Sequence, residues 1–251
     1  LWLNNSEYNF ISLPSFVNSL KIFNDNILAF QDKAISQILF NSRVQINTSD
    51  GVPIEISNSN KVEGKRYITN SIGCKNKHSI CESNHGIYFI DDYNKALYLF
   101  NGQFNNLGEA KSFQAWVKNN VTNKKWDPLN FNNITTFKDP INNEILFVNK
   151  NYSLAYNESL EQFTSFYSYN DVPYMIYNGE DNLIIKDNKL WLKNKGDYNM
   201  FFGQYKPFYV TVIANDNTGS DKIFDTVEFR SDSWNNDKLL QSSYDTLKVW
   251  N

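Results

Sequence analysis

Every cysteine and histidine of the chain lies within one short segment, and both are metal-ligating residue types. Cys74, His78, Cys81 and His85 follow the spacing Cys-x3-His-x2-Cys-x3-His in GCKNKHSICESNHG. A helix would place residues i, i+4, i+7 and i+11 on one face, where four such side chains could bind zinc tetrahedrally. The segment, however, is rich in Asn, Ser and Gly and has no apolar helical stripe. The helical zinc site is therefore the weaker of two interpretations.

A β-hairpin is the interpretation that we favour for this segment. On a strand, Cys74 and His78 would share one face, while Cys81 and His85 would share the other. We expect residues 78–81 to form a strand, residues 83–85 a turn, and Gly86 the start of the next strand. We therefore predict no bound metal and no other cofactor.

Aspartates in the expected turns are the second set of candidate catalytic groups. Paired carboxylates perform glycoside hydrolysis, and five-bladed propellers are one fold that houses such enzymes. None of these aspartates is flanked by residues that mark an acid or a nucleophile, and Asp is common in turns for conformational reasons. The sequence also lacks G-x-S-x-G and glycine-rich phosphate motifs. We assign no catalytic residue. The aspartates are Asp32, Asp91, Asp92, Asp187 and Asp197.

One locally basic stretch could contact phosphates. SNKVEGKRYITNSIGCKNK holds Lys61, Lys65, Arg66, Lys75 and Lys77. The net charge of −3 and the pI near 5.5 argue against nucleic-acid recognition. No apolar run reaches the length of a membrane span. We expect the basic stretch to be a solvated face or a protein contact.

Short β-like runs separated by Asn, Asp and Gly must position these groups. Aromatic residues make up 16% of the chain and favour half-buried, pleated surfaces. The abundant Asn residues favour turns over helix interiors. Only GEAKSFQAWVKNN has a helical pattern, because Phe113, Trp116 and Val117 share one face. The sequence predicts an all-β fold with one short helical insert near residues 109–120.

A strand–turn–strand unit recurs at residues 87–101, 145–158 and 183–194, with a looser copy at residues 27–41. Its first strand is a continuous apolar run, such as IYFI, ILFV or LII, which is typical of strands covered on both faces. We therefore expect residues 87–90, 145–148 and 183–185 to be hidden from solvent on either side.

A β-propeller provides such doubly covered strands. Blades of about 40–50 residues with four strands each would divide the chain into about five. We predict that residues 1–251 form a single β-propeller domain or a propeller fragment of a longer chain. A two-sheet β-sandwich is the alternative, but it does not account for the recurring hairpin.

An ordered series of segments resembles the muzzle, or stabilisation, proteins in the tails of crAss-like bacteriophages. The segments are GVPIEISNSNKVEGKRYITNSIGC, GIYFIDDYNKALYLFNGQ, FQAWVKNN, EQFTSFYSYNDVPYM, FFGQYKPFYVTVIAN and KIFDTVEFRSDSW. The resemblance runs from about residue 38 to the end of the chain. It implies a tail-nozzle type of propeller of which this chain is a fragment. The absent initiator Met and the strand-like last residues also lead us to expect a fragment.

The resemblance implies a structural protein with no enzyme activity. The subunit would form a ring, of six copies, in the virion tail after synthesis in the bacterial host cytoplasm. There it would contact neighbouring tail proteins, help to close the DNA channel, and retain or release the genome. DNA would pass without sequence readout, and a mildly acidic wall suits a conduit because it binds phosphates weakly. A five-bladed carbohydrate-binding protein or glycoside hydrolase is the alternative function.

Overall fold

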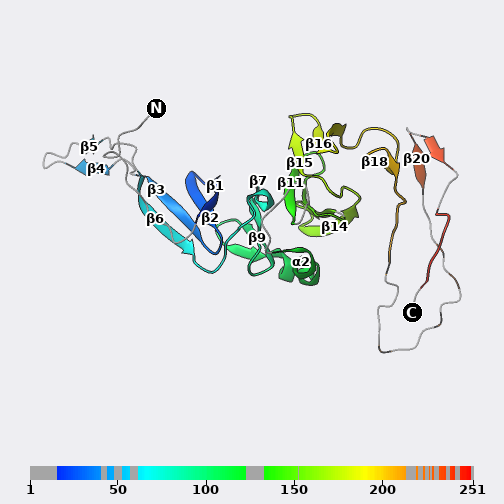
Figure 1. Ribbon diagram of the computed structural model, residues 1–251, viewed down its shortest axis with the longest axis horizontal. Helices are drawn as coiled ribbons and strands as arrows, with labels where there is room; N and C mark the ends of the chain where they lie inside the picture. Colours follow the sequence, from blue (N-terminus) through cyan, green and yellow to red (C-terminus); the bar gives the residue numbers. More distant parts are fainter. Residues whose placement is uncertain are drawn as a thin grey trace. The chain divides into compact units, whose positions relative to one another are not determined.

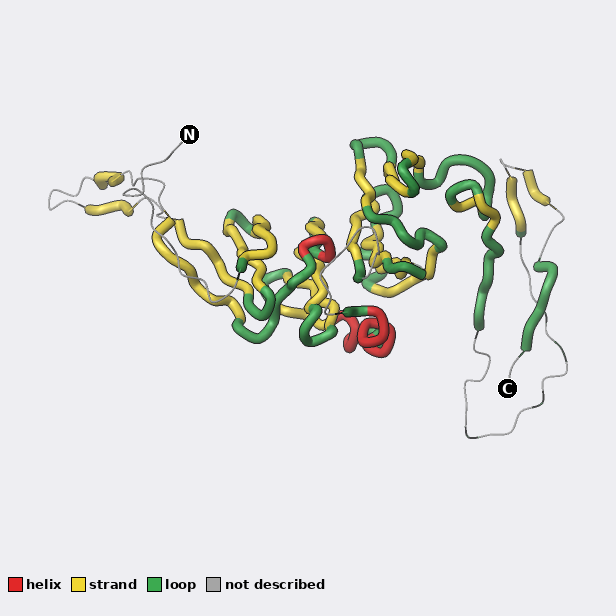
Figure 2. Tube along the Cα trace, viewed as in Figure 1, coloured by secondary structure: helices red, strands yellow, loops and turns green. Residues whose placement is uncertain are grey.

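The computed structural model describes residues 16–40, 44–47, 53–56, 62–122, 133–151 and 153–212, and beyond these residues 219, 223, 226, 228, 232–235, 238–240 and 244–249. The chain divides into two compact units, Leu1–Pro207 and Phe208–Asn251. Strands predominate in the described residues, and the helices are few and short (Figure 2). The all-β prediction is confirmed. The prediction of a single domain over residues 1–251 stays a prediction.

The first unit contains four antiparallel sheets that follow one another in the sequence (Figure 1). The first sheet has β1 (Val17–Phe23), β2 (Asn26–Gln31), β3 (Ile35–Phe40) and β6 (Val62–Thr69), with the hairpin β4 (Val44–Asn47) and β5 (Pro53–Ile56) inserted before β6. The second has β7 (Cys81–Ser83), β8 (Gly86–Asp91), β9 (Ala96–Phe100) and β10 (Phe104–Asn106). The third has β11 (Thr135–Asp139), β12 (Glu144–Val148), β13 (Ser153–Asn157) and β14 (Gln162–Tyr167). The fourth has β15 (Tyr174–Tyr177), β16 (Asn182–Lys186) and β17 (Lys189–Leu192).

The remaining described elements are short. The first unit also holds the 3-10 helix η2 (Lys77–Ser79), the helices α1 (Leu107–Ala110) and α2 (Gln114–Asn120), and the hairpin β18 (Met200–Phe201) with β19 (Gln204–Tyr205). The second unit holds the hairpin β20 (Ser233–Asn235) with β21 (Lys238–Leu240).

Each of the four sheets is an antiparallel meander in which sequential strands pair, except that the hairpin β4–β5 separates β3 from β6 in the first sheet. The first strands of the second, third and fourth sheets also lie close together, since β11 contacts both β7 and β15. Consecutive antiparallel meanders are the units from which propellers are built, and a sandwich has two sheets rather than four.

Three apolar cores lie between the four sheets, one between each pair of neighbours. In the first core, Leu28 and Phe30 of β2 meet Ile87 and Phe89 of β8. The rings of Phe30 and Phe89 contact each other edge to face, with centroids 5.3 Å apart. Edge-to-face contacts suit the opposite partial charges of a ring's edge and face. The first core therefore joins the first sheet to the second.

The other two cores use the alternate residues of the middle strands. Tyr88 and Ile90 of β8 pack with Ile145 and Phe147 of β12 in the second core. Leu146 and Val148 of β12 pack with Ile184 of β16 in the third core. Because successive side chains of a strand point to opposite faces, β8 and β12 are each covered on both sides. The predicted double burial of residues 87–90 and 145–148 is confirmed.

The predicted double burial is wrong for one face of β16. Ile184 is 1% exposed, but its neighbour Ile185 is 37% exposed. In the described part of the chain, a neighbouring sheet packs against the Ile184 face, and the Ile185 face stays open to solvent. A continuous apolar run shows that both faces of a strand are apolar. Each face is buried only where another part of the protein packs against it.

The predicted helical insert is confirmed at α1 and α2. Leu107 and Val117 are buried in the second core, and Phe113 and Trp116 pack against it. The side chain of Asn106 accepts a hydrogen bond from the backbone N–H of Glu109 and so caps α1. The insert therefore covers one end of the interface between the second and third sheets.

Candidate functional site

The four metal-ligand candidates do not lie on one helix. Cys74 precedes η2, His78 lies within η2, Cys81 begins β7, and His85 lies in the turn before Gly86. Across the described residues, no three His, Cys, Asp or Glu side chains gather as ligands for a metal ion. The hairpin interpretation is correct at Gly86, which opens β8, but wrong at His78.

His78 is helical because of a local cap. The side chain of Asn76 accepts a hydrogen bond from the backbone N–H of His78 at 3.1 Å, and this starts the 3-10 turn. Burial, followed by the charge of Lys77, lowers the pKa of His78. Both effects favour the neutral form of the imidazole.

Both cysteines are buried thiols. Cys74 is fully buried, and its Sγ donates to the backbone carbonyl of Asn76 at 3.2 Å. Burial raises the pKa of Cys74 far above that of a free thiol, and burial raises the pKa of Cys81 to about 12. Burial therefore favours the protonated form of both thiols in the metal-free protein, and a protonated thiol is a poor nucleophile.

His85 instead contributes to a contact between the second and third sheets. Its Nδ1 lies 3.3 Å from Oε1 of Glu158, and the Ser83 hydroxyl donates to the same oxygen. Glu158 is buried in the turn after β13. Ser, His and Glu are the residue types of a hydrolytic triad, but a triad needs the serine hydroxyl to donate to the imidazole. Here both groups bind the carboxylate, so Ser83 is not activated and the cluster joins two sheets.

Asp91 organises the turn that follows β8. Its Oδ1 accepts hydrogen bonds from the backbone N–H groups of Tyr93 and Asn94 at 2.9 and 2.8 Å. Its Oδ2 accepts from the Asn94 side chain at 2.7 Å and from the backbone N–H of Gly73 at 3.1 Å. Asp91 thus shapes its own turn and fixes the loop that enters the second sheet.

Asp92 fixes the same entering loop from the next position. Its Oδ2 accepts from the backbone N–H groups of Lys75 and Asn76 at 3.1 and 3.0 Å. Its Oδ1 accepts from the Asn133 side chain at 2.7 Å. Burial raises the pKa of Asp92, while these hydrogen bonds oppose the shift. Its oxygens are engaged by the protein itself.

The other three candidate aspartates lie in separate turns. Asp32 follows β2 and accepts a hydrogen bond from the Asn18 side chain at 2.7 Å. Asp187 lies between β16 and β17 and has a positive φ of 51°. Asp197 precedes β18. The five aspartates therefore serve several turns of the fold rather than one cleft.

A buried ion pair joins the third and fourth sheets. Lys193 follows β17 and is 4% exposed, and its Nζ donates to Oδ2 of Asp139, which is fully buried at the end of β11. The Asn182 side chain donates to Oδ1 of the same aspartate. Burial alone would raise the pKa of Asp139, but the hydrogen bond and charge of Lys193 outweigh it and lower the pKa.

Aromatic rings and a second carboxyl surround the lysine. Nζ of Lys193 lies 5.8 and 5.3 Å from the ring centroids of Tyr167 and Tyr169, within the range of cation–π attraction. The Tyr167 hydroxyl donates to Oε1 of Glu144 at 3.1 Å, and burial raises the pKa of Glu144. This cluster was not predicted from the sequence. Its signal is a repeated D-x-x-N: Asp139 binds its own turn, through Asn142, as Asp91 does through Asn94.

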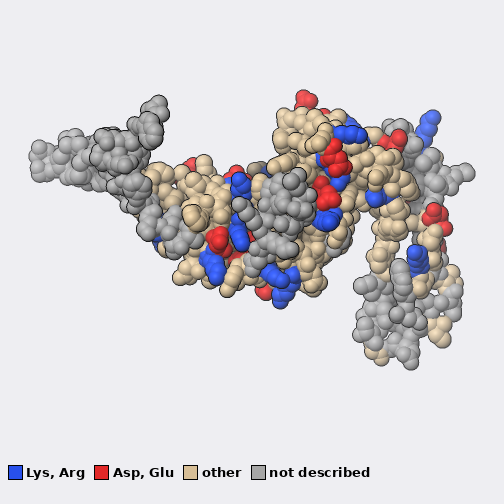
Figure 3. All heavy atoms as spheres, in the orientation of Figure 1, with Lys and Arg blue, Asp and Glu red and all other residues tan. Residues whose placement is uncertain are grey.

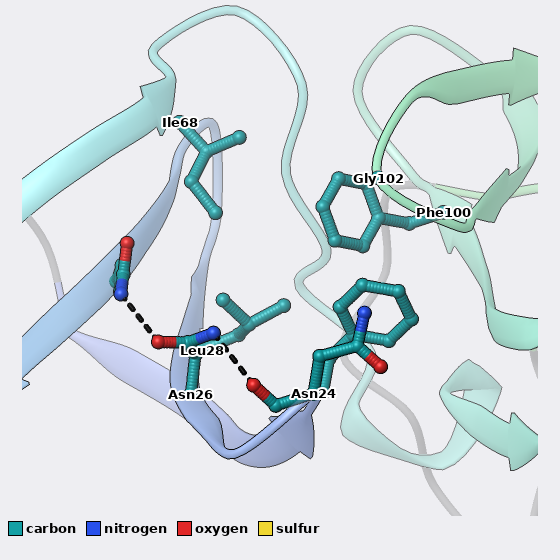
Figure 4. Close-up of a pocket in the computed structure, with 8 residues that line it drawn as sticks. Asn24, Asn26, Leu28, Ile68, Phe100 and Gly102 are labelled. Atoms are coloured by element: carbon teal, nitrogen blue, oxygen red, sulfur yellow. Dashed lines mark hydrogen bonds between the residues drawn. The ribbon is translucent and has the colours of Figure 1, made fainter.

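The described surface includes a shallow pocket of about 260 Å³ between the first and second sheets (Figure 4). The Gln37 side chain donates to Oδ1 of Asn26, whose own Nδ2 donates to the backbone carbonyl of Asn24, each at 2.7 Å. The pocket has aromatic and amide groups but no carboxylate, so it lacks the acid pair of a glycosidase. Its lining residues are Phe23, Asn24, Asn26, Leu28, Gln37, Ile68, Phe100 and Gly102.

The basic stretch does not dominate the visible charge. Lys65 and Arg66 lie on β6, and Lys75 and Lys77 lie beside and in η2. Lys61 lies outside the described residues. In the face that Figure 3 shows, Lys and Arg alternate with Asp and Glu over the first unit. A charge field for nucleic acid would instead have one sign.

The buried polar groups of this chain connect its sheets and turns. Together with the four sheets, they define the class of the protein as a β-protein built from repeated antiparallel meanders. No helix in the described stretches has both the length and the apolar character to cross a bilayer.

Comparisons with known proteins identify the family. The family model described as Crassvirus muzzle protein matches residues 16–188, and that of the Crassvirus muzzle protein C-terminal domain matches residues 196–251. The curated "Muzzle protein" of Bacteroides phage crAss001 is 50% identical over 234 residues, which are 93% of this chain and 17% of that relative. The chain belongs to the crAss-like phage muzzle protein family. It spans less than a fifth of the relative's length.

Proposed function

We propose that the chain is part of a muzzle subunit in the tail of a crAss-like phage virion, where it helps to close the DNA channel and to retain or release the genome. The observation that carries this proposal is the family match, which covers residues 16–188 and 196–251. The buried networks around Asp139 and Glu158 support a structural role, because they join neighbouring sheets. The protein would be synthesised in the host cytoplasm and assembled into the tail.

Propeller blades are the architecture that we propose for the four sheets. The support is their regular stacking: each core takes alternate residues of a middle strand, and β11 lies beside both β7 and β15. Radial sheets with neighbouring inner strands have this geometry. Further sheets of the complete protein would complete the propeller.

The proposed partners are other copies of the subunit, in a ring of six, and the neighbouring tail proteins. DNA would pass through the ring without sequence readout. The mixed charge of the visible surface and the net charge of −3 support this, since a wall rich in Lys and Arg would hold phosphates.

Virions that lack the protein provide the test. A nonsense mutation early in the gene, grown on suppressor and non-suppressor hosts, would give particles with and without the product. We expect cryo-electron microscopy to show density for the stacked sheets at the tail only in the first population. We also expect the second population to hold less packaged DNA per capsid. Full capsids and unchanged tail density in the absence of the product would refute the proposal.

Carbohydrate binding remains a second candidate because of the pocket in Figure 4. The ring of Phe23, which packs on the buried Phe100, lies beside the amides of Asn24, Asn26 and Gln37, a combination that suits sugars. A ligand at 100 times its Kd stabilises the folded state by about 2.7 kcal/mol. A panel of glycans should therefore raise the melting temperature if this function holds, and Gln37→Ala should abolish the shift. An unchanged melting temperature with every glycan would remove the candidate.

A further inference from the structure

The fourth sheet carries an apolar face that is open to solvent. Cross-strand pairing places Ile176, Leu183 and Leu192 side by side, and Ile185 beside Leu190. Side chains that pair directly across strands point to the same face. Four of the five are exposed, from 37% at Ile185 to 65% at Leu190. We call these five residues the outer face of the fourth sheet.

The opposite face of the same sheet packs against a neighbouring sheet, which indicates what kind of contact the outer face can make. Ile184 and Trp191 point away from the outer face and pack in the third core, against Leu146 and Val148 of the third sheet. The outer face is also apolar, because its five residues are Ile and Leu, and Tyr174, which pairs with Ile185, lies beside them. A contiguous apolar face of this kind marks a contact surface.

At the other end of the series, the first sheet also has exposed apolar residues, but on its edge strand β1, since Leu28–Gln31 of the middle strand β2 are buried. Leu28 and Phe30 of β2 enter the first core, and the opposite face carries Ile22, which pairs with Ile27 and is 67% exposed. Leu20, on the same face, is 58% exposed. The two sheets inside the series have no such open apolar face on their middle strands, since β8 and β12 are buried throughout.

We propose that a further antiparallel sheet of the complete polypeptide packs on the outer face of the fourth sheet. All three cores of the first unit form when one sheet meets another through alternate apolar residues, so the same partner fits here. The chain covers only 17% of its curated relative, which leaves ample polypeptide to supply that sheet. The proposal rests on the sheet stacking proposed above, but it does not depend on the tail function, because it concerns only which surface covers these five residues.

Thiol labelling measures this cover directly. Cys74 and Cys81 are buried with raised pKa values, so they give little background with a maleimide. Leu190→Cys places a thiol on the outer face, and Glu180→Cys places one in the exposed turn between β15 and β16 as the matched control. Each variant is made both in the 251-residue chain and in the complete gene product.

We expect the two thiols to react at similar rates in the 251-residue chain. In the complete gene product, Leu190→Cys should react at least roughly tenfold more slowly, because labelling then requires local opening, while Glu180→Cys stays fast. Equal rates in the complete product would overturn the proposal. Slow labelling of Leu190→Cys already in the 251-residue chain would also overturn it, because the chain itself would then cover the face. Protection that disappears on dilution would assign the face to a second copy instead of a sheet of the same polypeptide.

Discussion

Replacement of Lys193 by methionine tests the buried ion pair between the third and fourth sheets. Met keeps an unbranched side chain of similar length but removes the charge, so Asp139 stays buried without its cation. Removing one partner of a buried pair costs about 3–5 kcal/mol. We expect a loss of about 3 kcal/mol in the free energy of unfolding, at the low end of that range, because Asn182 and Asn142 still donate to the carboxylate.

Chemical denaturation followed by tryptophan fluorescence measures that loss. In a chain of this size, about 3 kcal/mol corresponds to a fall of roughly 6–12 °C in melting temperature. Lys195→Met is the matched control, since Lys195 lies 3.6 Å from Asp181 with a side chain that is 61% exposed. An exposed pair of this kind contributes little, so the control should change stability by less than about 0.5 kcal/mol.

The pH dependence of the same variant has a defined sign. The pKa of Asp139 is lowered in the folded protein, so the stabilisation that the pair provides is present above the unfolded pKa and is lost as the pH falls through the folded one. In Lys193→Met, burial should instead raise the pKa of Asp139. The difference in stability between the parent chain and the variant should therefore begin to shrink as the pH falls through the raised pKa of the variant, and it should be smallest below the lowered pKa of the parent. If Lys193→Met matched Lys195→Met at pH 7, the assignment of the pair as a structural link would be refuted.

Two further predictions concern the segment with the cysteines and histidines. Gly86 has a φ of +140°, and a Cβ there would lie 2.3 Å from the carbonyl oxygen of Phe100. Gly86→Ala should therefore lower the free energy of unfolding by at least about 2 kcal/mol. Gly102→Ala is the control, because Gly102 has open space around it and the substitution adds only the strain of a positive φ. An equal effect of the two substitutions would show that the close approach to β9 is unimportant. The purified chain should contain no stoichiometric zinc, and Cys81→Ser should leave the metal content unchanged, as measured by mass spectrometry of the metals; one zinc per chain that is lost in Cys81→Ser would restore the metal-site hypothesis.

The burial of the middle strands could be predicted from the sequence, because consecutive residues of a strand lie on its two opposite faces. Runs such as residues 87–90 and 145–148 contain no polar residue, so neither face suits water. The run at residues 183–185 looks the same, yet Ile185 is exposed. The sequence of a strand therefore predicts which of its faces are apolar. It does not predict whether another of the described elements packs against each face.

The polar contacts were less accessible to sequence reasoning. Asp139 and Lys193 are 54 residues apart and come from different sheets, so no local pattern links them. The turn chemistry of Asp139 was available, because its D-x-x-N matches that of Asp91. The 3-10 turn at His78 also has a local signal, since Asn76 is a good N-cap residue. The apparent His and Cys cluster came from sequence proximity, whereas the partner of His85 is Glu158, in the turn that follows β13 of the third sheet.

Substitutions on opposite faces of β8 test the stacking of sheets most directly. Phe89 points into the first core and Ile90 into the second, and both are fully buried. A strand between two sheets should tolerate neither Phe89→Ala nor Ile90→Ala, so each should lower the free energy of unfolding by about 2–5 kcal/mol. A loss below about 1 kcal/mol at either position would mean that one face of β8 lies in water. That result would contradict the stacked arrangement.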